Sequence, residues 1–418
     1  MHAGELRSMA GKLALTGMAL AGSFLVLNMP AWGHGRASPA AIGADAARAI
    51  EFPDVPGYQT LVVDLHSHSV FSDGHVWPRI RIEEALRDGL DGFAVTEHLE
   101  YQPHRVDIPH PDRNRAFAEA EAAAEGTGLI VIAGSEITRD LPAGHINAVF
   151  INDANSLFQV EQPPVDPSQT DAYYQAAGQW PAESALAAAN AQKAFVFINH
   201  PYWTRQRPSG KAELTDLHRG LIAREQIHGI EIANGDTFSA EALEIALASD
   251  LALIGVSDVH DLIDWDYPPS EGAHRPVTLV MAKTRSADGI REALFANRTV
   301  VWFRNLLIGR EAELLPLLAA SVSATEVRWV EGSDTLAVTL TNRSDADFEL
   351  RNDSGMTIVE HDVRLRIPAH ASTTFTLRPG KRTPNVTLPL VVENALTSPG
   401  KHPTLVLKLA PSAATASR

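Results

Sequence analysis

The amino-acid sequence predicts an α/β barrel followed by a small all-β sandwich. Short apolar runs alternate with helical stretches from residue 60 to residue 302. Such alternation is typical of a mainly parallel sheet, and seven or eight units of this kind favour a barrel. An open doubly wound sheet is the alternative. Beyond about residue 313 the segments alternate apolar and polar residues between clusters of Asn, Asp, Gly and Pro, which is typical of a sandwich.

The expected barrel strands are short runs rich in Val, Ile and Leu. They cover residues 61–65, 92–96, 129–132, 145–151, 194–198, 229–233 and 251–256. Helical spacing predicts helices at 79–88, 114–125, 182–193 and 239–249, and a closing helix and strand within 286–301. The expected sandwich strands lie at 326–341, 348–352, 372–377 and 404–409, and the polar tail 411–418 is expected to be disordered.

The N-terminus has the pattern of a secretory signal. Arg7 and Lys12 supply positive charge before the apolar stretch 13–29, and small residues follow it. A membrane anchor is the alternative, but the stretch is barely long enough to span a bilayer. We therefore expect a signal peptide at 1–33, a linker at 34–58, no membrane span after cleavage, and a periplasmic or secreted protein.

Composition limits the partners and the chemistry. The formal net charge is -16 and no basic tract stands out, so nucleic acid is not an expected partner. A small anionic substrate stays compatible, because bound divalent ions reverse the local field. There is no cysteine, so a metal site would use imidazole and carboxylate. Composition does not indicate an oligomeric state.

Possible metal ligands follow nearly every expected strand. In an α/β barrel the C-terminal ends of the strands and the loops after them converge on one face. Residues that are far apart in the sequence would therefore meet there. The candidate ligands are His66, His68, Asp73, His98, Glu136, His145, His200, Asp258 and His260.

The spacing of these residues suits metal binding. His66 and His68 are two apart on an extended segment, so both point to one face, and Asp258 and His260 repeat the pattern. A carboxylate such as Glu136 can bridge two ions. Mixed imidazole and carboxylate ligands favour zinc, iron or manganese over magnesium. A single histidine of this kind is usually a polar core or surface residue, but the joint pattern favours a site with several metal ions. Five histidines lack this placement and are expected to be surface residues or core residues with satisfied hydrogen bonds: His104, His110, His218, His228 and His274.

These motifs, in this order, resemble the polymerase and histidinol phosphatase (PHP) superfamily of metal-dependent phosphoesterases over residues 60–302. The matching segments are Asp64-Leu65-His66-Ser67-His68, Ser72-Asp73-Gly74, Thr96-Glu97-His98, Gly134-Ser135-Glu136, Gly144-His145, Asn199-His200-Pro201 and Ser257-Asp258-Val259-His260. The resemblance implies a distorted seven-stranded (β/α) barrel at 59–312, before a β-sandwich domain at 313–410. Many relatives have Asp at the position of Glu97. Because this residue precedes a ligand and is not one itself, the difference counts against a supporting role for its side chain more than against metal binding.

The resemblance also implies three divalent metal ions, of Mn, Zn or Fe. One ion would be held by His66, His68, Glu136 and Asp258. Glu136 would bridge to a second ion, which His145 and His200 complete. Asp73, His98 and His260 would hold the third.

Within the superfamily, the secretory signal and the C-terminal β-domain resemble secreted bacterial phosphodiesterases. The phrases that carry this narrower likeness are Glu136-Ile137-Thr138-Arg139, Gly144-His145-Ile146-Asn147-Ala148 and His274-Arg275-Pro276. Relatives there are associated with organophosphate diesters. The likeness implies that the substrate is a small organic phosphodiester.

The mechanistic hypothesis is attack on phosphorus by a hydroxide that bridges two ions. Asp258 could also accept a proton from the attacking water. Arg139 and Arg275 are candidates for binding the phosphoryl oxygens, with surface ion pairing as the alternative. Tyr202 and Trp203 either form an apolar wall for the ester group or pack the loop.

Three other functions stay open. A phosphomonoesterase of the same fold is the nearest. A metal-dependent amidohydrolase or lactonase would share the His-x-His strand, but that class typically has a bridging Lys where this chain has Glu136. A non-catalytic metal-binding or adhesion protein would act through its C-terminal domain, whose role could also be to bind a glycan or to cover the barrel.

Overall fold

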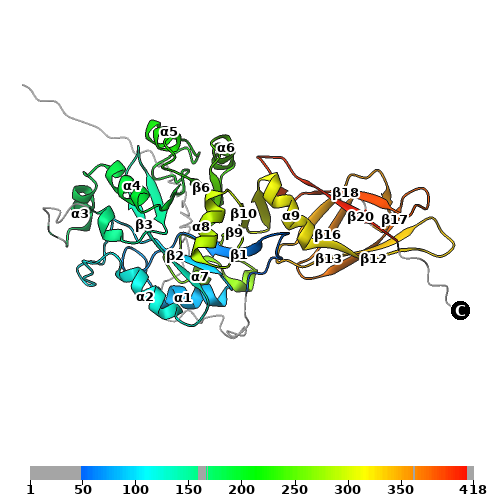
Figure 1. Cartoon of the computed structure of the whole chain (residues 1–418), viewed down its shortest axis with the longest axis horizontal. Helices are drawn as coiled ribbons and strands as arrows, with labels where there is room; N and C mark the ends of the chain where they lie inside the picture. The colour runs from blue at the N-terminus through cyan, green and yellow to red at the C-terminus, as the bar shows by residue number, and fades with distance from the viewer. Residues whose placement is uncertain (1–48, 159–165, 167, 361–362, 412–418) are drawn as a thin grey trace, which may run out of the picture. The chain divides into compact units, whose positions relative to one another are not determined.

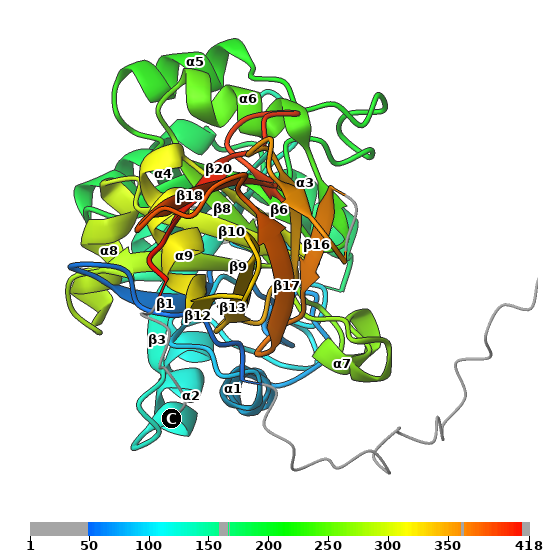
Figure 2. The ribbon, with the colours of Figure 1, turned by 90° about the vertical axis from the view of Figure 1, so that its right-hand side faces the viewer.

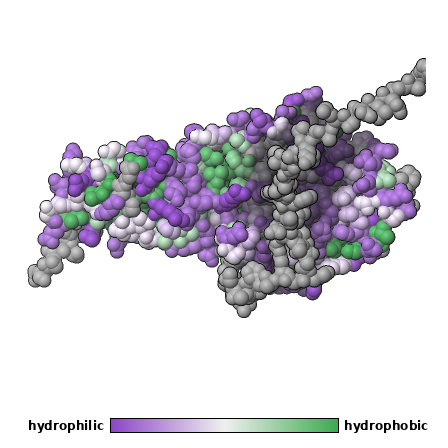
Figure 3. Space-filling model, turned by 180° about the vertical axis from the view of Figure 1, so that it is seen from behind, coloured by the Kyte–Doolittle hydropathy of each residue, from purple (hydrophilic) through white to green (hydrophobic). Residues whose placement is uncertain are grey.

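The computed structural model describes residues 49–158, 166, 168–360 and 363–411. The expected signal peptide, residues 34–48 of the expected linker and residues 412–418 of the tail lie outside these ranges. Within the described ranges, no helix is long and apolar enough to cross a membrane. The face drawn in Figure 3 is mostly hydrophilic and carries only small separate apolar patches.

One large sheet forms the first part of the chain (Figure 1). Its order is β19-β11-β10-β9-β1-β2-β3-β4-β5-β6-β7, with β8 also paired to β6. In the described residues its strands are β1 (Gln59–Asp64), β2 (Gly92–Val95), β3 (Ile130–Thr138), β4 (His145–Val149), β5 (Phe195–Ile198), β6 (Gly229–Asn234), β7 (Thr237–Phe238), β8 (Ala252–Val256), β9 (Val277–Ala282), β10 (Thr299–Phe303), β11 (Leu306–Gly309) and β19 (Ala395–Leu396).

The sheet is mixed and curls into a half-barrel, so the expectation of a mainly parallel, seven-stranded barrel needs correction. β1, β2 and β3 are parallel, but β3 pairs antiparallel with β4, and β4 with β5. The connection between β3 and β4 is too short for a crossover helix, which forces a reversal of direction. β9, β10 and β11 also run antiparallel.

Helices surround the half-barrel (Figures 1 and 2). The four predicted helices and the predicted closing helix are present, and α3, α5, α7 and α9 add to them. The described helices are α1 (Pro78–Arg87), α2 (Arg115–Ala124), α3 (Thr170–Ala177), α4 (Ala182–Ala191), α5 (Asp216–Ala223), α6 (Ala240–Ala248), α7 (Ile263–Asp266), α8 (Ala287–Phe295) and α9 (Glu311–Ser321), with 3-10 turns at Ala154–Leu157 and Pro269–Glu271. α9 contains residue 313, where the predicted domain boundary falls.

Alternation along β1 aims the metal-binding segment. Leu61, Val63 and Leu65 belong to one buried cluster inside the half-barrel, whereas Val62 belongs to the cluster on the other side. Side chains on a strand alternate between the two faces of the sheet. The apolar residues of β1 thus fix its register as far as Asp64, and His66 and His68 follow directly after the strand ends.

The C-terminal part consists of two four-stranded sheets, as expected for a sandwich. Burial alternates along β13, which is typical of strands that pack one face inward. The sheet orders are β12-β13-β17-β15 and β16-β14-β18-β20. The strands are β12 (Val322–Trp329), β13 (Leu336–Asn342), β14 (Phe348–Asn352), β15 (Thr357–Ile358), β16 (Arg364–Ile367), β17 (Ser372–Arg378), β18 (Val386–Val392) and β20 (Thr404–Leu409).

Candidate metal centre

All nine predicted ligands lie within one connected cluster of side chains. The first group forms where β1 and β8 end. The Nε2 atoms of His66 and His68 face each other at 3.0 Å. Asp258 Oδ1 lies 3.2 Å from His66 Nε2 and 3.1 Å from His68 Nε2. The three side chains therefore present their ligand atoms to one point.

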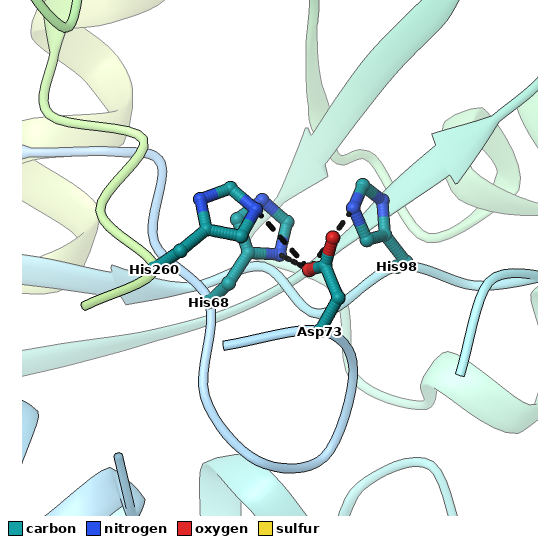
Figure 4. Close-up of side chains that lie close together, drawn as sticks. All are labelled: His68, Asp73, His98 and His260. Atoms are coloured by element: carbon teal, nitrogen blue, oxygen red, sulfur yellow. Dashed lines mark ion pairs between the residues drawn. The ribbon is translucent and has the colours of Figure 1, made fainter. Parts of the chain in front are cut away.

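A second group surrounds Asp73, on the loop after β1 (Figure 4). Asp73 Oδ1 lies 3.9 Å from His68 Nδ1, 3.3 Å from His98 Nε2 and 3.1 Å from His260 Nε2. His68 and His260 approach the carboxylate from one side and His98 from the other. His98 follows β2, and His260 follows β8.

A third group surrounds Glu136, on β3. Its carboxylate lies 2.5 Å from His98 Nδ1, 2.8 Å from His145 Nδ1 and 3.6 Å from His200 Nε2. Oε2 of the same carboxylate also lies 3.7 Å from His66 Nε2 and 3.5 Å from His68 Nε2. Glu136 thus reaches the first group as well, as a bridging ligand must.

Three buried carboxylate oxygens, one in each group, lack a hydrogen-bond partner. They are Asp73 Oδ1, Glu136 Oε2 and Asp258 Oδ1. A buried anionic oxygen without donors is costly unless a cation neutralises it. Each of these oxygens faces imidazole nitrogens, and imidazole with carboxylate is a donor set for divalent transition metals. The residues present therefore fit metal ions.

The electrostatics of the centre favour cations. Burial opposes ionisation of Asp73, Glu136 and Asp258, but the surrounding histidines outweigh it and hold the pKa of each carboxyl well below its usual range. Burial, with His98 and His260 nearby, lowers the pKa of His68 to about 3. The side chain of His260 is partly exposed; its partial burial lowers the pKa, but Asp73 and Asp258 outweigh this and raise the pKa to about 9. Ionised carboxylates thus stand beside a neutral His68, which leaves its lone pair available.

A crystal structure from Bacteroides vulgatus resembles nearly the whole chain. It is a two-domain protein containing a predicted PHP-like metal-dependent phosphoesterase, with 36% sequence identity and a TM-score of 0.77, and the match covers 88% of this chain and 100% of that one. This chain belongs to the PHP-like metal-dependent phosphoesterases.

Other comparisons are more distant or partial. A putative metal-dependent phosphoesterase from Bifidobacterium adolescentis is 19% identical, with a TM-score of 0.37, over 56% of this chain and 95% of that chain. An amidohydrolase from Chromobacterium violaceum is also 19% identical, with a TM-score of 0.34, over 48% and 87%. A family model described as an Ig-like domain matches residues 322–408. Among curated proteins, none matches this chain.

Glu231, on β6, supports the ligands of this PHP-like centre and was missed from the sequence. Its Oε1 lies 2.7 Å from His66 Nδ1, and its Oε2 accepts the backbone N–H of His200 at 2.6 Å. Asn234 Nδ2 donates to Glu231 Oε2 at 2.9 Å and to Asp258 Oδ2 at 3.1 Å. His200 and Asp258 have φ values of 22° and 52°, so this network holds both in a left-handed backbone. An acidic residue inside an apolar strand was the signal that could have revealed it.

We expect Glu231→Gln to weaken metal binding about 10- to 100-fold, because the carboxylate that orients His66 loses its charge. A metal titration against a competing chelator would measure the change. Glu244→Gln, on the exposed face of α6, is the matched control. Unchanged affinity in Glu231→Gln would show that His66 is held by other contacts.

Glu97 holds the loop that carries Asp73. It accepts hydrogen bonds from the backbone N–H of Ser69 and from the hydroxyls of Ser69 and Ser72, the two hydroxyl bonds at 2.5 Å. Burial raises the pKa of Glu97, against these bonds. At Gly74 a Cβ would lie 2.7 Å from the backbone of His68, so only glycine lets the loop fold back this closely. Glu97 therefore holds the loop of Asp73 although it departs from the Asp of many relatives.

The two arginines predicted to bind phosphoryl oxygens are both buried in ion pairs. Arg275 is 1% exposed and pairs with Asp64 at 3.1 Å and with Asp88 at 2.7 Å. Arg139 is buried against Glu100. Both arginines are therefore ion-paired, but in buried pairs rather than in the surface pairs given as the alternative.

The two aromatic residues after His200 have different environments. Tyr202 is buried, and its hydroxyl donates to Thr237 O at 3.2 Å, so it packs the loop. Trp203 is 36% exposed, and its ring centroid lies 5.3 Å from that of His145 and 5.4 Å from that of His200. Trp203 is therefore the one of the pair that borders the centre.

Proposed function

We propose that the protein hydrolyses phosphate esters with three divalent ions of Mn, Zn or Fe, and that small organic phosphodiesters are its substrates. The observation that carries the proposal is the set of three carboxylate oxygens without hydrogen-bond partners among nine candidate ligands, eight of which fall in groups that could hold a metal ion while His200 lies 3.6 Å from Glu136, in a PHP-like phosphoesterase. Bound ions would supply water that is nucleophilic near neutral pH and would stabilise the charge that develops on the phosphoryl oxygens.

The side chains of this chain would orient the reaction. Asp258 presents Oδ1 toward the imidazoles, while Asn234 fixes Oδ2, so one oxygen is held and the other faces the site. We propose that Asp258 binds metal through Oδ1 and also accepts a proton from the attacking water. Trp203 offers an apolar surface beside His145 and His200 for the ester group.

The nearby arginines already form ion pairs with carboxylates, and this supports a diester over a monoester as the substrate. A monoester carries more negative charge and needs more cationic partners. Arg139 and Arg275 are already neutralised by carboxylates. A singly charged diester needs fewer cationic partners.

We expect the purified protein to cleave bis(p-nitrophenyl) phosphate faster than p-nitrophenyl phosphate, and to lose activity when a chelator removes its metal. Adding back Mn²⁺, Zn²⁺ or Fe²⁺ should restore the rate, and elemental analysis would identify the native ions. Full activity after chelation would contradict the proposal. Turnover of lactones or amides in place of phosphate esters would support the amidohydrolase alternative.

We place the protein in the periplasm or outside the cell. The charged and apolar pattern of residues 1–33 supports export. The Ig-like match at residues 322–408 is compatible with an extracellular protein. At that location a small phosphodiester is a more natural substrate than nucleic acid.

A further inference from the structure

Arg205 lies on the loop that carries His200 and Trp203, and its side chain is exposed. Its guanidinium carbon is 5.7 Å from the centroid of the Trp203 ring. That ring in turn lies against His145 and His200. Arg205 therefore stands at the outer side of the second predicted ligand set.

Tyr101 borders the centre from another loop. Its ring centroid is 5.8 Å from that of His98 and 5.7 Å from that of Tyr174. Tyr101, Trp203 and Arg205 together are called the rim below.

The guanidinium of Arg205 has no carboxylate partner among the described residues. Among the described residues it forms no ion pair and no hydrogen bond, and its side-chain contact is the face of Trp203. Other arginines near the centre are engaged: Arg81 with Glu84 and the carbonyls of His68, His260 and Asp261, Arg139 with Glu100, and Arg275 with Asp64 and Asp88. In a chain with a net charge of -16, an unpaired guanidinium beside a cluster of ligands indicates an anionic ligand.

We propose that Arg205 binds the anionic oxygens of the substrate while Tyr101 and Trp203 contact its organic group, so that the site prefers phosphate esters with a planar aromatic or heteroaromatic group. The inference rests on the proposed function. A guanidinium offers two parallel donors that match phosphoryl oxygens. Ring faces stack on planar groups and gain less from small alkyl groups.

The test compares Arg205→Met and Arg205→Lys with Arg224→Met, an exposed arginine at the end of α5. In metal-loaded protein, Arg205→Met should raise the Kd of inorganic phosphate and the KM of bis(p-nitrophenyl) phosphate about tenfold or more, with kcat and metal content retained. Arg205→Lys should recover part of the loss, and Arg224→Met should match the wild type. Unchanged Kd and KM, or a loss of metal instead, would overturn the role of Arg205.

The aromatic part of the rim has a separate readout. Trp203→Leu and Tyr101→Leu should raise the KM of aryl diesters several-fold and leave that of diethyl phosphate unchanged. An equal rise for both substrates would overturn the preference for planar groups. If the wild type cleaves no phosphate ester, the proposed function fails. Calorimetric titration with inorganic phosphate and with phenyl phosphate would then decide whether Arg205 and the two rings bind their ligand groups.

Discussion

Glu136→Ala is expected to lose metal and to lower kcat/KM on a phosphodiester by about a thousandfold or more. The carboxylate contacts ligands of all three groups, and Asn199 Nδ2 donates to its Oε1 at 2.8 Å. In the proposed centre its removal would take a ligand from two ions at once, and it leaves the facing imidazoles without their anion. Metal ions supply several kcal/mol of stabilisation to such a transition state, and about 1.4 kcal/mol corresponds to a factor of ten in rate.

Two further variants make this result interpretable. Glu121→Ala, on the exposed face of α2, changes the same residue type far from any ligand and should keep full activity and metal. Glu136→Gln keeps the size of the side chain and removes the charge, so it should resemble Glu136→Ala in metal content. A Glu136→Ala protein that retains its full metal complement by elemental analysis would contradict a bridging role.

Arg275→Met is expected to destabilise the fold by about 3–5 kcal/mol, because it leaves the carboxylate of Asp64 buried without its cation and removes the nearer cation of Asp88, whose other neighbour Arg87 lies 3.9 Å away. Asp64 is fully buried, and it also accepts hydrogen bonds from the backbone N–H and the hydroxyl of Ser257. When the negative charge of Asp64 is no longer neutralised, its hydrogen bonds to Ser257 should be disturbed, and with them the position of the adjacent Asp258. The midpoint of denaturant unfolding, compared with the wild type, measures the change.

The same variant separates the two roles considered for Arg275. If Arg275 is structural, Arg275→Met should lower the unfolding midpoint, and combining it with Asp64→Asn should recover part of the loss. Arg224→Met should leave the midpoint unchanged. An Arg275→Met protein of wild-type stability with a raised KM would instead restore the prediction that Arg275 binds the phosphoryl group.

Much of the barrel and the grouping of the candidate ligands could be predicted because both depend on local sequence patterns. The apolar run of β1 and the two histidines after it need no distant partner to be recognised, since strand register alone aims them. Similar strand ends supply His98, His200 and Asp258. Candidate ligands at strand ends can therefore be located from the sequence even where the direction of a neighbouring strand is predicted incorrectly.

What failed depended on tertiary partners. The reversal between β3 and β4 follows from a short connection whose pairing is visible only in space. Arg275 and Asp64 are separated by 211 positions, so no local pattern could show that they neutralise each other. Arg205 escaped notice for the opposite reason. Its significance lies in the absence of such a partner among the described residues.

Because β19 pairs with β11, the half-barrel and the Ig-like part depend on each other. β19 lies between β18 and β20 in the sequence, yet it joins the large sheet beside β11, and Asn394 Nδ2 donates to Asn305 O and Asp347 O on either side of the junction. An uncovered strand edge invites aggregation. The Ig-like part thus covers an edge of the large sheet. Deleting or replacing this part would remove β19 and expose the edge of β11.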